Sequence, residues 1–217
     1  MKFPWGSCLL HSSHRFVATG ACLAALSALA PPVAAATLNL RVSDAAGKSL
    51  SHAVLMLEPM AGKLAVAPMA GVEITQVKRQ FAPQISVVTV GTPVVFPNLD
   101  SVRHHVYSFS PIKQFELKLY SGVPSKPVVF DKPGVAVIGC NIHDRMVAWV
   151  VVVDTPLYAM SEGNGKAHIA SVGPGLYQLK VWHAGLRAGQ ELPTTAIHIA
   201  NTDVDHDVRL DVQGNEP

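Results

Sequence analysis

Three side chains that bind soft metal ions lie close together in the second half of the chain. Cys140, His143 and Met146 are separated from one another by two residues each, and His104 precedes them on a segment upstream. A thiolate and two imidazoles form a trigonal set that suits copper in both oxidation states, and a thioether adds a weak axial bond. The four residues therefore predict one mononuclear copper site, whose chemistry would be the transfer of single electrons.

Zinc is the main alternative ion, because cysteine and histidine also bind it. The thioether of Met146 favours copper over zinc, since it is a soft ligand. Each residue also has a plain structural interpretation: Cys140 as a buried inert thiol, Met146 as part of the core and His143 as a surface loop residue. Their occurrence together within one short segment favours the metal site.

The first 36 residues have the layout of a secretory signal peptide. Lys2 and Arg15 give a positive start, an apolar run covers residues 16–30, Pro31 follows, and residues 34–36 are three small alanines. The alternative is a transmembrane anchor, but the run is shorter than the roughly 20 residues that a spanning helix needs. We expect cleavage after Ala36 and a periplasmic mature protein with no transmembrane segment.

Cleavage would change both the charge and the cysteine content. The whole chain has 17 basic and 15 acidic residues, and the removed segment carries two of the basic ones, Lys2 and Arg15, so the mature chain is neutral. A neutral chain without a basic run gives no indication of nucleic-acid binding. Cys8 and Cys22 leave as well, so Cys140 remains alone in an oxidising compartment, where a free thiol is a liability unless it is buried or occupied.

The elements that position these residues are predicted to be strands. Short β-rich segments recur between turn signals, and no segment keeps a helical period over three turns, which predicts an all-β protein. A strand at 135–139 would deliver Cys140 at its end, and a strand from Val147 would begin beside Met146. The predicted strands are 37–43, 53–57, 72–77, 84–90, 93–96, 106–109, 115–119, 128–130, 135–139, 147–153, 166–170, 177–183, 196–200 and 208–212.

Residues 72–154 resemble the cupredoxin family. The resemblance includes 81–83 (Phe-Ala-Pro), the segment 94–100, 132–134 (Lys-Pro-Gly) and the Cys-x2-His-x2-Met loop, whose length is closest to that of the amicyanins. The loop is also similar to that of exported proteins labelled methylamine-utilization proteins, although no residue here indicates amine oxidation. The resemblance implies a Greek-key β-sandwich with His104, Cys140, His143 and Met146 as the copper ligands.

Two positions depart from the cupredoxin pattern. Many cupredoxins have asparagine after the first ligand histidine, and this chain has His105, which could keep a hydrogen bond or compete as a ligand. The register of His104 before Val106 favours His104. Many relatives also have an aromatic residue two positions before the cysteine, where Ile138 stands, and we expect both changes to tune the site.

The flanking segments resemble carboxypeptidase-regulatory-like β-sandwiches. The resemblance rests on the segment 42–54 and on 174–177 (Pro-Gly-Leu-Tyr) after the copper block. We expect residues 37–66 and 155–213 to form one discontinuous sandwich into which the cupredoxin domain is inserted, as exposed loops tolerate. The alternative is a tandem arrangement, in which residues 37–57 join the cupredoxin sheet.

These features predict an electron carrier that serves redox protein partners, with His143 as the electron port and Asp144 and Arg145 as partner contacts. The alternatives are a copper-binding or copper-delivery protein without redox turnover, and a metal-free interaction module in which the site has decayed. No nucleophile lies in a motif with a base, so we predict no enzymatic activity and no catalytic residue. The remaining histidines of the mature chain receive structural interpretations: His52, His168, His183, His198 and His206.

Overall fold

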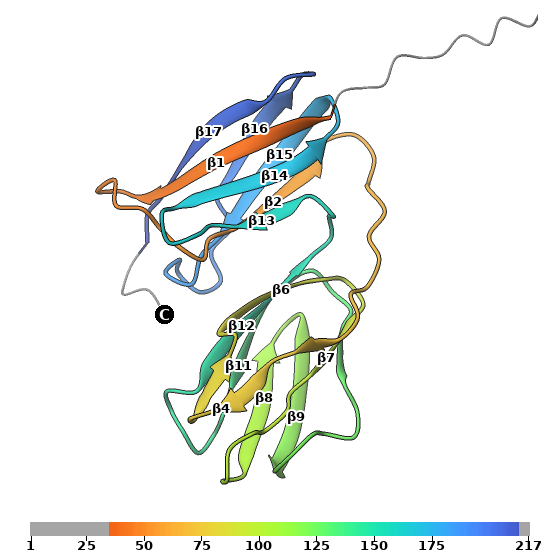
Figure 1. Cartoon of the computed structure of the whole chain (residues 1–217), viewed down its shortest axis with the longest axis vertical. Helices are drawn as coiled ribbons and strands as arrows, with labels where there is room; N and C mark the ends of the chain where they lie inside the picture. The colour runs from red at the N-terminus through yellow and green to blue at the C-terminus, as the bar shows by residue number, and fades with distance from the viewer. Residues whose placement is uncertain (1–34, 213–217) are drawn as a thin grey trace, which may run out of the picture. The chain divides into compact units, whose positions relative to one another are not determined.

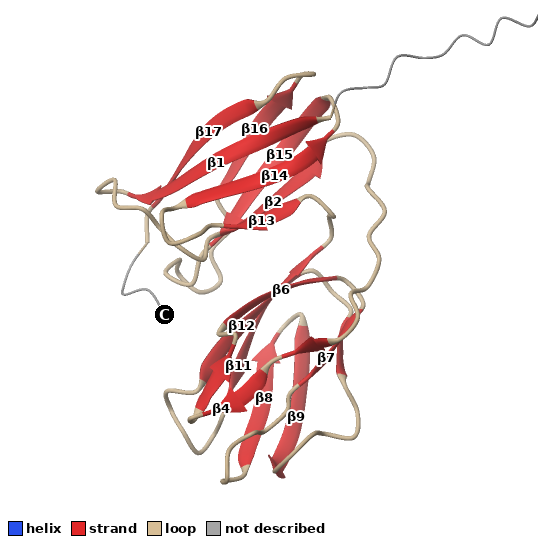
Figure 2. Ribbon diagram, viewed as in Figure 1, coloured by secondary structure: helices blue, strands red, loops and turns tan. Residues whose placement is uncertain are grey.

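The computed structural model describes residues 35–212, and within this range it consists of strands joined by loops (Figures 1 and 2). The prediction of an all-β protein is confirmed. No helix in the described range is long and apolar enough to cross a membrane. The predicted signal peptide lies almost entirely outside the described residues, and the first strand begins at Ala36, which is buried.

The two ends of the described chain build two sheets together. The first has the order β14-β1-β17, with β1 (Ala36–Asp44) between β14 (Lys166–Val172) and β17 (Val204–Leu210). The second has the order β13-β2-β15-β16, from β13 (Tyr158–Met160), β2 (Val54–Pro59), β15 (Gly175–Trp182) and β16 (Thr194–Ile199). β1 is antiparallel to β14 and parallel to β17.

Side-chain alternation explains how these strands form a core. Leu38, Leu40 and Val42 of β1 are buried, whereas the residues between them are partly or fully exposed, as the two-residue period of a strand requires. The buried residues of β1 share one apolar cluster with Leu55 of β2 and Leu179 of β15, so the two sheets contact each other through their apolar faces.

Residues 72–153 build the other sheets. The largest has the order β6-β12-β11-β8-β9, from β6 (Ile85–Thr89), β12 (Val147–Val153), β11 (Gly134–Gly139), β8 (His104–Ser110) and β9 (Lys113–Tyr120). A three-stranded sheet has the order β10-β7-β3, from β10 (Val128–Phe130), β7 (Thr92–Val95) and β3 (Val72–Glu73). A separate hairpin pairs β4 (Thr75–Val77) with β5 (Gln80–Ala82).

Each sheet of the described chain takes its strands either from residues 72–153 or from the flanking segments. β1 and β2 pair with strands that follow residue 157, and neither pairs with a strand of residues 72–153. The discontinuous division into 37–66 with 155–213, and 72–154, stays our proposal for the folding units.

Three neighbouring strands bring the predicted ligand residues to one end of the five-stranded sheet. β8 begins at His104, β11 ends immediately before Cys140, and β12 begins immediately after Met146. The register pairs Gly139 of β11 with Val147 on one side and with Tyr107 on the other. The end of β11 therefore lies between the start of β12 and the first half of β8.

Candidate metal centre

His104 is fully buried and has one free ring nitrogen. Its Nε2 lies 2.8 Å from Oδ2 of Asp100, and its Nδ1 is buried without a hydrogen-bond partner. A carboxylate accepts hydrogen bonds, so Nε2 carries the ring hydrogen and Nδ1 keeps its lone pair. A buried lone pair without a partner costs free energy, and a metal ion would satisfy it.

Cys140 and His143 lie close to the ring of His104. Cys140 is buried at 4% exposure, and its Sγ lies 3.9 Å from Nδ1 of His143. The rings of His104 and His143 meet edge to face, with centroids 5.0 Å apart. One ligand atom from each of the three residues lies within 4.8 Å of the other two, the only such group of His, Cys, Asp and Glu in residues 35–212.

Met146 lies at the base of the same loop. It is 1% exposed and belongs to the same apolar cluster as Cys140. Its backbone N–H donates to the carbonyl of His143 at 2.9 Å, and the N–H of Val147 donates to the carbonyl of Arg145 at 3.1 Å. These two hydrogen bonds close the loop into a tight turn. The buried side chain of Met146 therefore follows His143 within one turn of the backbone.

His105 is turned toward a different partner. Its Nε2 lies 2.8 Å from Oε1 of Glu116 on β9, and its Nδ1 is buried without a partner, as in His104. The structure brings His104, and not His105, together with Cys140 and His143. The assignment of His104, Cys140, His143 and Met146 as the four ligands is part of the proposal below.

Asp100 holds His104 in place, a role that the residue pattern alone does not indicate. Its Oδ1 accepts the backbone N–H of Lys78 at 2.7 Å, and its Oδ2 accepts that of Arg79 at 2.9 Å as well as the ring of His104. Burial raises the pKa of Asp100, but these hydrogen bonds outweigh burial, so its pKa lies below the usual value. A charged carboxylate therefore anchors the imidazole and increases its basicity as a ligand.

The turn that donates to Asp100 has an uncommon backbone. Lys78 and Arg79 have φ angles of 53° and 58°, in the left-handed region that residues other than glycine seldom adopt. Two successive residues of this kind form the tight turn of the β4–β5 hairpin. The turn directs both of its N–H groups at Asp100, so the hairpin supports the site through this one carboxylate.

Asn98 fixes the segment that carries Asp100. Its side-chain Nδ2 donates to the carbonyls of Val102 and Tyr120 at 2.9 Å and 2.8 Å, and its Oδ1 accepts the N–H of Asp100 at 3.0 Å. Nearby, the hydroxyl of Tyr120 donates to the carbonyl of Phe96, and burial raises the pKa of Tyr120 to about 12. Tyr120 therefore stays protonated at neutral pH and can keep this bond.

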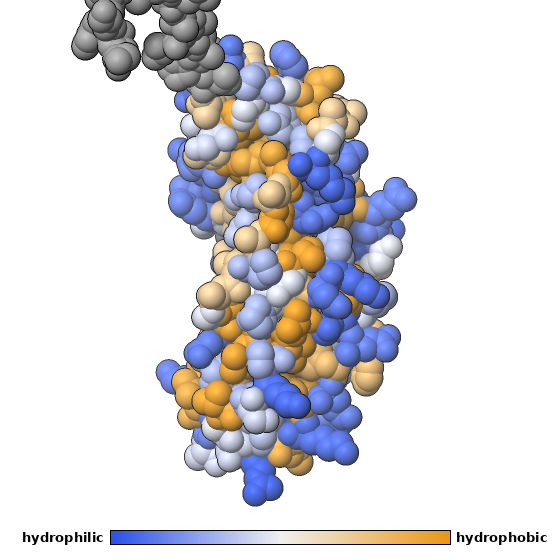
Figure 3. Space-filling model, turned by 90° about the vertical axis from the view of Figure 1, so that its right-hand side faces the viewer, coloured by the Kyte–Doolittle hydropathy of each residue, from blue (hydrophilic) through white to orange (hydrophobic). Residues whose placement is uncertain are grey.

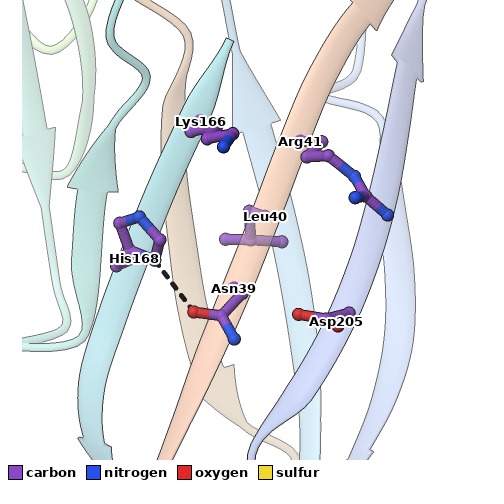
Figure 4. A pocket seen from close by; sticks show the side chains of 6 residues that line it. All are labelled: Asn39, Leu40, Arg41, Lys166, His168 and Asp205. Carbon is purple, nitrogen blue, oxygen red and sulfur yellow. Dashed lines mark hydrogen bonds between the residues drawn. The ribbon is translucent and has the colours of Figure 1, made fainter. Parts of the chain in front are cut away.

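A surface pocket on the outer face of the β14-β1-β17 sheet, outside the candidate metal centre, is lined mainly by polar and charged side chains (Figure 4). His168 shares a hydrogen bond of 2.8 Å with Oδ1 of Asn39, and Arg41 forms an ion pair with Asp207 at 2.7 Å. These side chains come from three strands and lie apart along the sheet, with Asp205 beside Asn39 (Figure 4). His168 with Asn39 and Arg41 with Asp207 are thus paired on an exposed polar face, and the structural interpretation of His168 stays a prediction.

Comparisons with known proteins return similarity to solved structures alone. No protein-family model matches the chain. The comparison with curated proteins also gives no match.

The similar solved structures include cupredoxins and a copper enzyme. A purple cupredoxin from Nitrosopumilus maritimus is 24% identical over 38% of this chain and 100% of its own, with a TM-score of 0.35. An amicyanin variant in its reduced Cu(I) form is 18% identical over 40% of this chain and 92% of its own, with a TM-score of 0.35. The copper-containing nitrite reductase of Thermus scotoductus SA-01 is 27% identical over 44% of this chain and 25% of its own, with a TM-score of 0.36.

Proposed function

We propose that this protein is an exported, periplasmic carrier of single electrons with one mononuclear type 1 copper site. The observation that carries the proposal is the approach of His104, Cys140 and His143 to within 4.8 Å, with the Nδ1 of His104 buried and without a partner. A thiolate with two imidazoles and a thioether is the donor set of blue copper sites. When bound, copper would supply a centre that gains or loses one electron.

The residues around the site support a geometry that changes little between oxidation states. Asp100 fixes the ring of His104, and Cys140 and Met146 are buried in the apolar core at strand ends. Side chains held by packing and hydrogen bonds stay near one geometry. Little reorganisation then accompanies the gain or loss of an electron.

The proposed carrier serves redox protein partners that are still to be identified. His143 is half-buried, and Asp144 and Arg145 beside it are exposed, so a partner can approach this ligand from solvent. We propose His143 as the electron port and these two charged residues as partner contacts. An electron carrier needs no substrate pocket, and we assign no catalytic residue and no enzymatic reaction to the chain.

Copper loading of the mature chain tests the proposal. With copper(II), the protein should develop an intense visible colour from sulfur-to-copper charge transfer and a type 1 electron-spin spectrum, and it should cycle reversibly with a one-electron reductant. Cys140→Ser should abolish the colour, because it removes the sulfur donor. Colour that survives in Cys140→Ser would refute the ligand assignment. Tight copper(I) binding without reversible cycling would support copper delivery instead.

A further inference from the structure

Four exposed cations on three loops surround the segments that carry the predicted ligands. Lys78 and Arg79 form the turn that donates to Asp100, Arg103 directly precedes His104, and Arg145 lies in the Cys140–Met146 loop. None of the four has an ion-pair partner in residues 35–212, where every Lys or Arg ion pair with a carboxylate lies elsewhere: Arg41–Asp207, Lys63–Asp154, Lys113–Asp131 and Lys180–Glu58.

The carboxylates of the same loops offset these cations only in part, since the loops carry four cations and two carboxylates, Asp100 and Asp144. Asp144 is exposed, but Asp100 is directed inward, with its side chain 15% exposed and its oxygens engaged by His104 and two backbone N–H groups. Asp100 lies in a surface hollow with Lys78, Arg79, Ser101 and Val102. The mature chain as a whole is predicted to be neutral, so the positive charge at this end is a local property.

Large apolar side chains are exposed on the same loops. Leu99 is 65% exposed, Val102 is 38% exposed, and Ile142, between Cys140 and His143, is 47% exposed. Figure 3 shows that hydrophobic and hydrophilic side chains are exposed beside one another on the face in view. Apolar residues combined with uncompensated charge are typical of surfaces that bind another protein transiently.

We infer that this ligand-end surface, formed by Lys78, Arg79, Arg103, Arg145 and the apolar Leu99, Val102 and Ile142, docks the acidic face of a one-electron redox protein. The inference rests on the proposed function. One electron passes between the partner's redox centre and this chain's site, so that one is oxidised as the other is reduced, and no bond or proton is transferred. Complementary charge accelerates and orients such an encounter, and the three exposed apolar side chains offer a small contact area.

A paramagnetic anion tests the surface on the copper-free protein. Hexacyanochromate(III), a trianion, should broaden the backbone amide NMR signals of residues 78–79, 99–103 and 141–145 more than those of other exposed loops. The cation tris(ethylenediamine)chromium(III) should not broaden them selectively. Added salt should reverse the effect of the anion, because exposed charges are screened over about 10 Å at 0.1 M.

Two double variants with the same change of charge separate this surface from the charge of the whole chain. Arg79→Glu with Arg103→Glu should remove the selective broadening. Lys48→Glu with Lys132→Glu, in exposed turns away from the ligand loops, should retain it. In the copper-loaded protein, the rate constant of oxidation by ferricyanide at low salt should fall about tenfold or more in the first double variant and less than twofold in the second.

The outcomes separate this inference from the proposed function. A chain that takes up no copper refutes the proposed function, and the anion still reports on the surface. A chain that binds copper but shows no selective broadening at these loops, or equal rate losses in both double variants, overturns the docking inference. Broadening by the cation in place of the anion would also overturn it.

Discussion

At the scale of single residues, the candidate site depends on one imidazole that is anchored at one nitrogen and free at the other. Asp100 accepts from Nε2 of His104, and the opposite nitrogen is left buried and without a partner. The anchoring carboxylate lies in the loop that leads into β8, four residues before the histidine. A metal-binding histidine is normally oriented by such an outer partner, whose removal typically weakens metal affinity.

Asp100→Asn should lower the copper affinity about 10- to 100-fold, because the neutral amide no longer stabilises the imidazole as a ligand. Competition with a chelator of known affinity measures the change. Asp144→Asn is the matched control: it removes the same charge from an exposed residue beside His143 and should change the affinity by less than about threefold. Equal losses in the two variants would show that Asp100 acts through charge alone and does not anchor His104.

The two adjacent histidines should respond differently to the same substitution. His104→Asn should abolish the copper(II) colour, since it removes a nitrogen of the three-residue cluster. His105→Asn should retain the colour, because the ring of His105 is bonded to Glu116 on the neighbouring strand. Visible spectra of the two copper-loaded variants check this, and loss of colour in His105→Asn would make His105 the ligand.

The sequence could predict the candidate metal ligands but not the residues that hold them in place. Cys140, His143 and Met146 are candidates from the sequence because their spacing within one loop is itself the signal. Asp100 and the turn at Lys78 were not found, because their contact joins segments about 20 residues apart and involves backbone N–H groups that no residue type reveals. Contacts of this kind follow from the folded arrangement of the chain.

At the scale of elements, one glycine at the end of β11 allows a close approach between strands. A side chain at Gly139 would place its Cβ 2.9 Å from the ring of Tyr107 on β8, and its φ angle is not in the left-handed region. Glycine is therefore required here by space and not by backbone conformation. The ring of Tyr107 packs over the backbone directly before Cys140.

Gly139→Ala should destabilise the protein by about 1–3 kcal/mol, because the added methyl group forces the ring of Tyr107 or the strand to move. Chemical denaturation measures the loss. Gly163→Ala is the control, since a Cβ there meets nothing within 4 Å, and it should stay within about 0.5 kcal/mol of the parent. Gly139→Ala combined with Tyr107→Ala should show less than the sum of the single losses; additive losses would refute the clash.

Strand prediction succeeds where β-branched residues are concentrated and fails where a strand lacks them or is polar. The strands at 128–130 and 147–153 are observed with their predicted bounds. β5 and β13 are not predicted, because their sequences, Gln-Phe-Ala and Tyr-Ala-Met, lack the β-branched residues that indicate the equally short β10. The last strand is predicted at 208–212 and observed at Val204–Leu210. The prediction begins too late because exposed aspartates alternate with Val204, His206 and Val208, so this half of the strand resembles a solvated loop.

At the scale of the whole molecule, the connection between β2 and β3 is hydrogen-bonded to the sheets of residues 72–153 before it enters them. The carbonyl of Ala67 accepts the hydroxyl of Thr89 at 2.7 Å, and the N–H of Met69 donates to the hydroxyl of Thr92 at 2.9 Å. Both threonines belong to the sheets of residues 72–153. The segment that precedes the predicted boundary at residue 72 is therefore attached to those sheets.

A fragment of residues 66–154 should fold cooperatively and develop the copper(II) colour by itself, because it contains every strand of its sheets and the predicted ligands. A fragment of 72–154 should also fold but be less stable, by roughly 1 kcal/mol for each of the two lost hydrogen bonds. Urea denaturation of both fragments gives the difference. A 66–154 fragment that stays unfolded, beside a full chain that folds and binds copper, would show that the flanking strands are needed for folding and would reject the inserted-domain proposal.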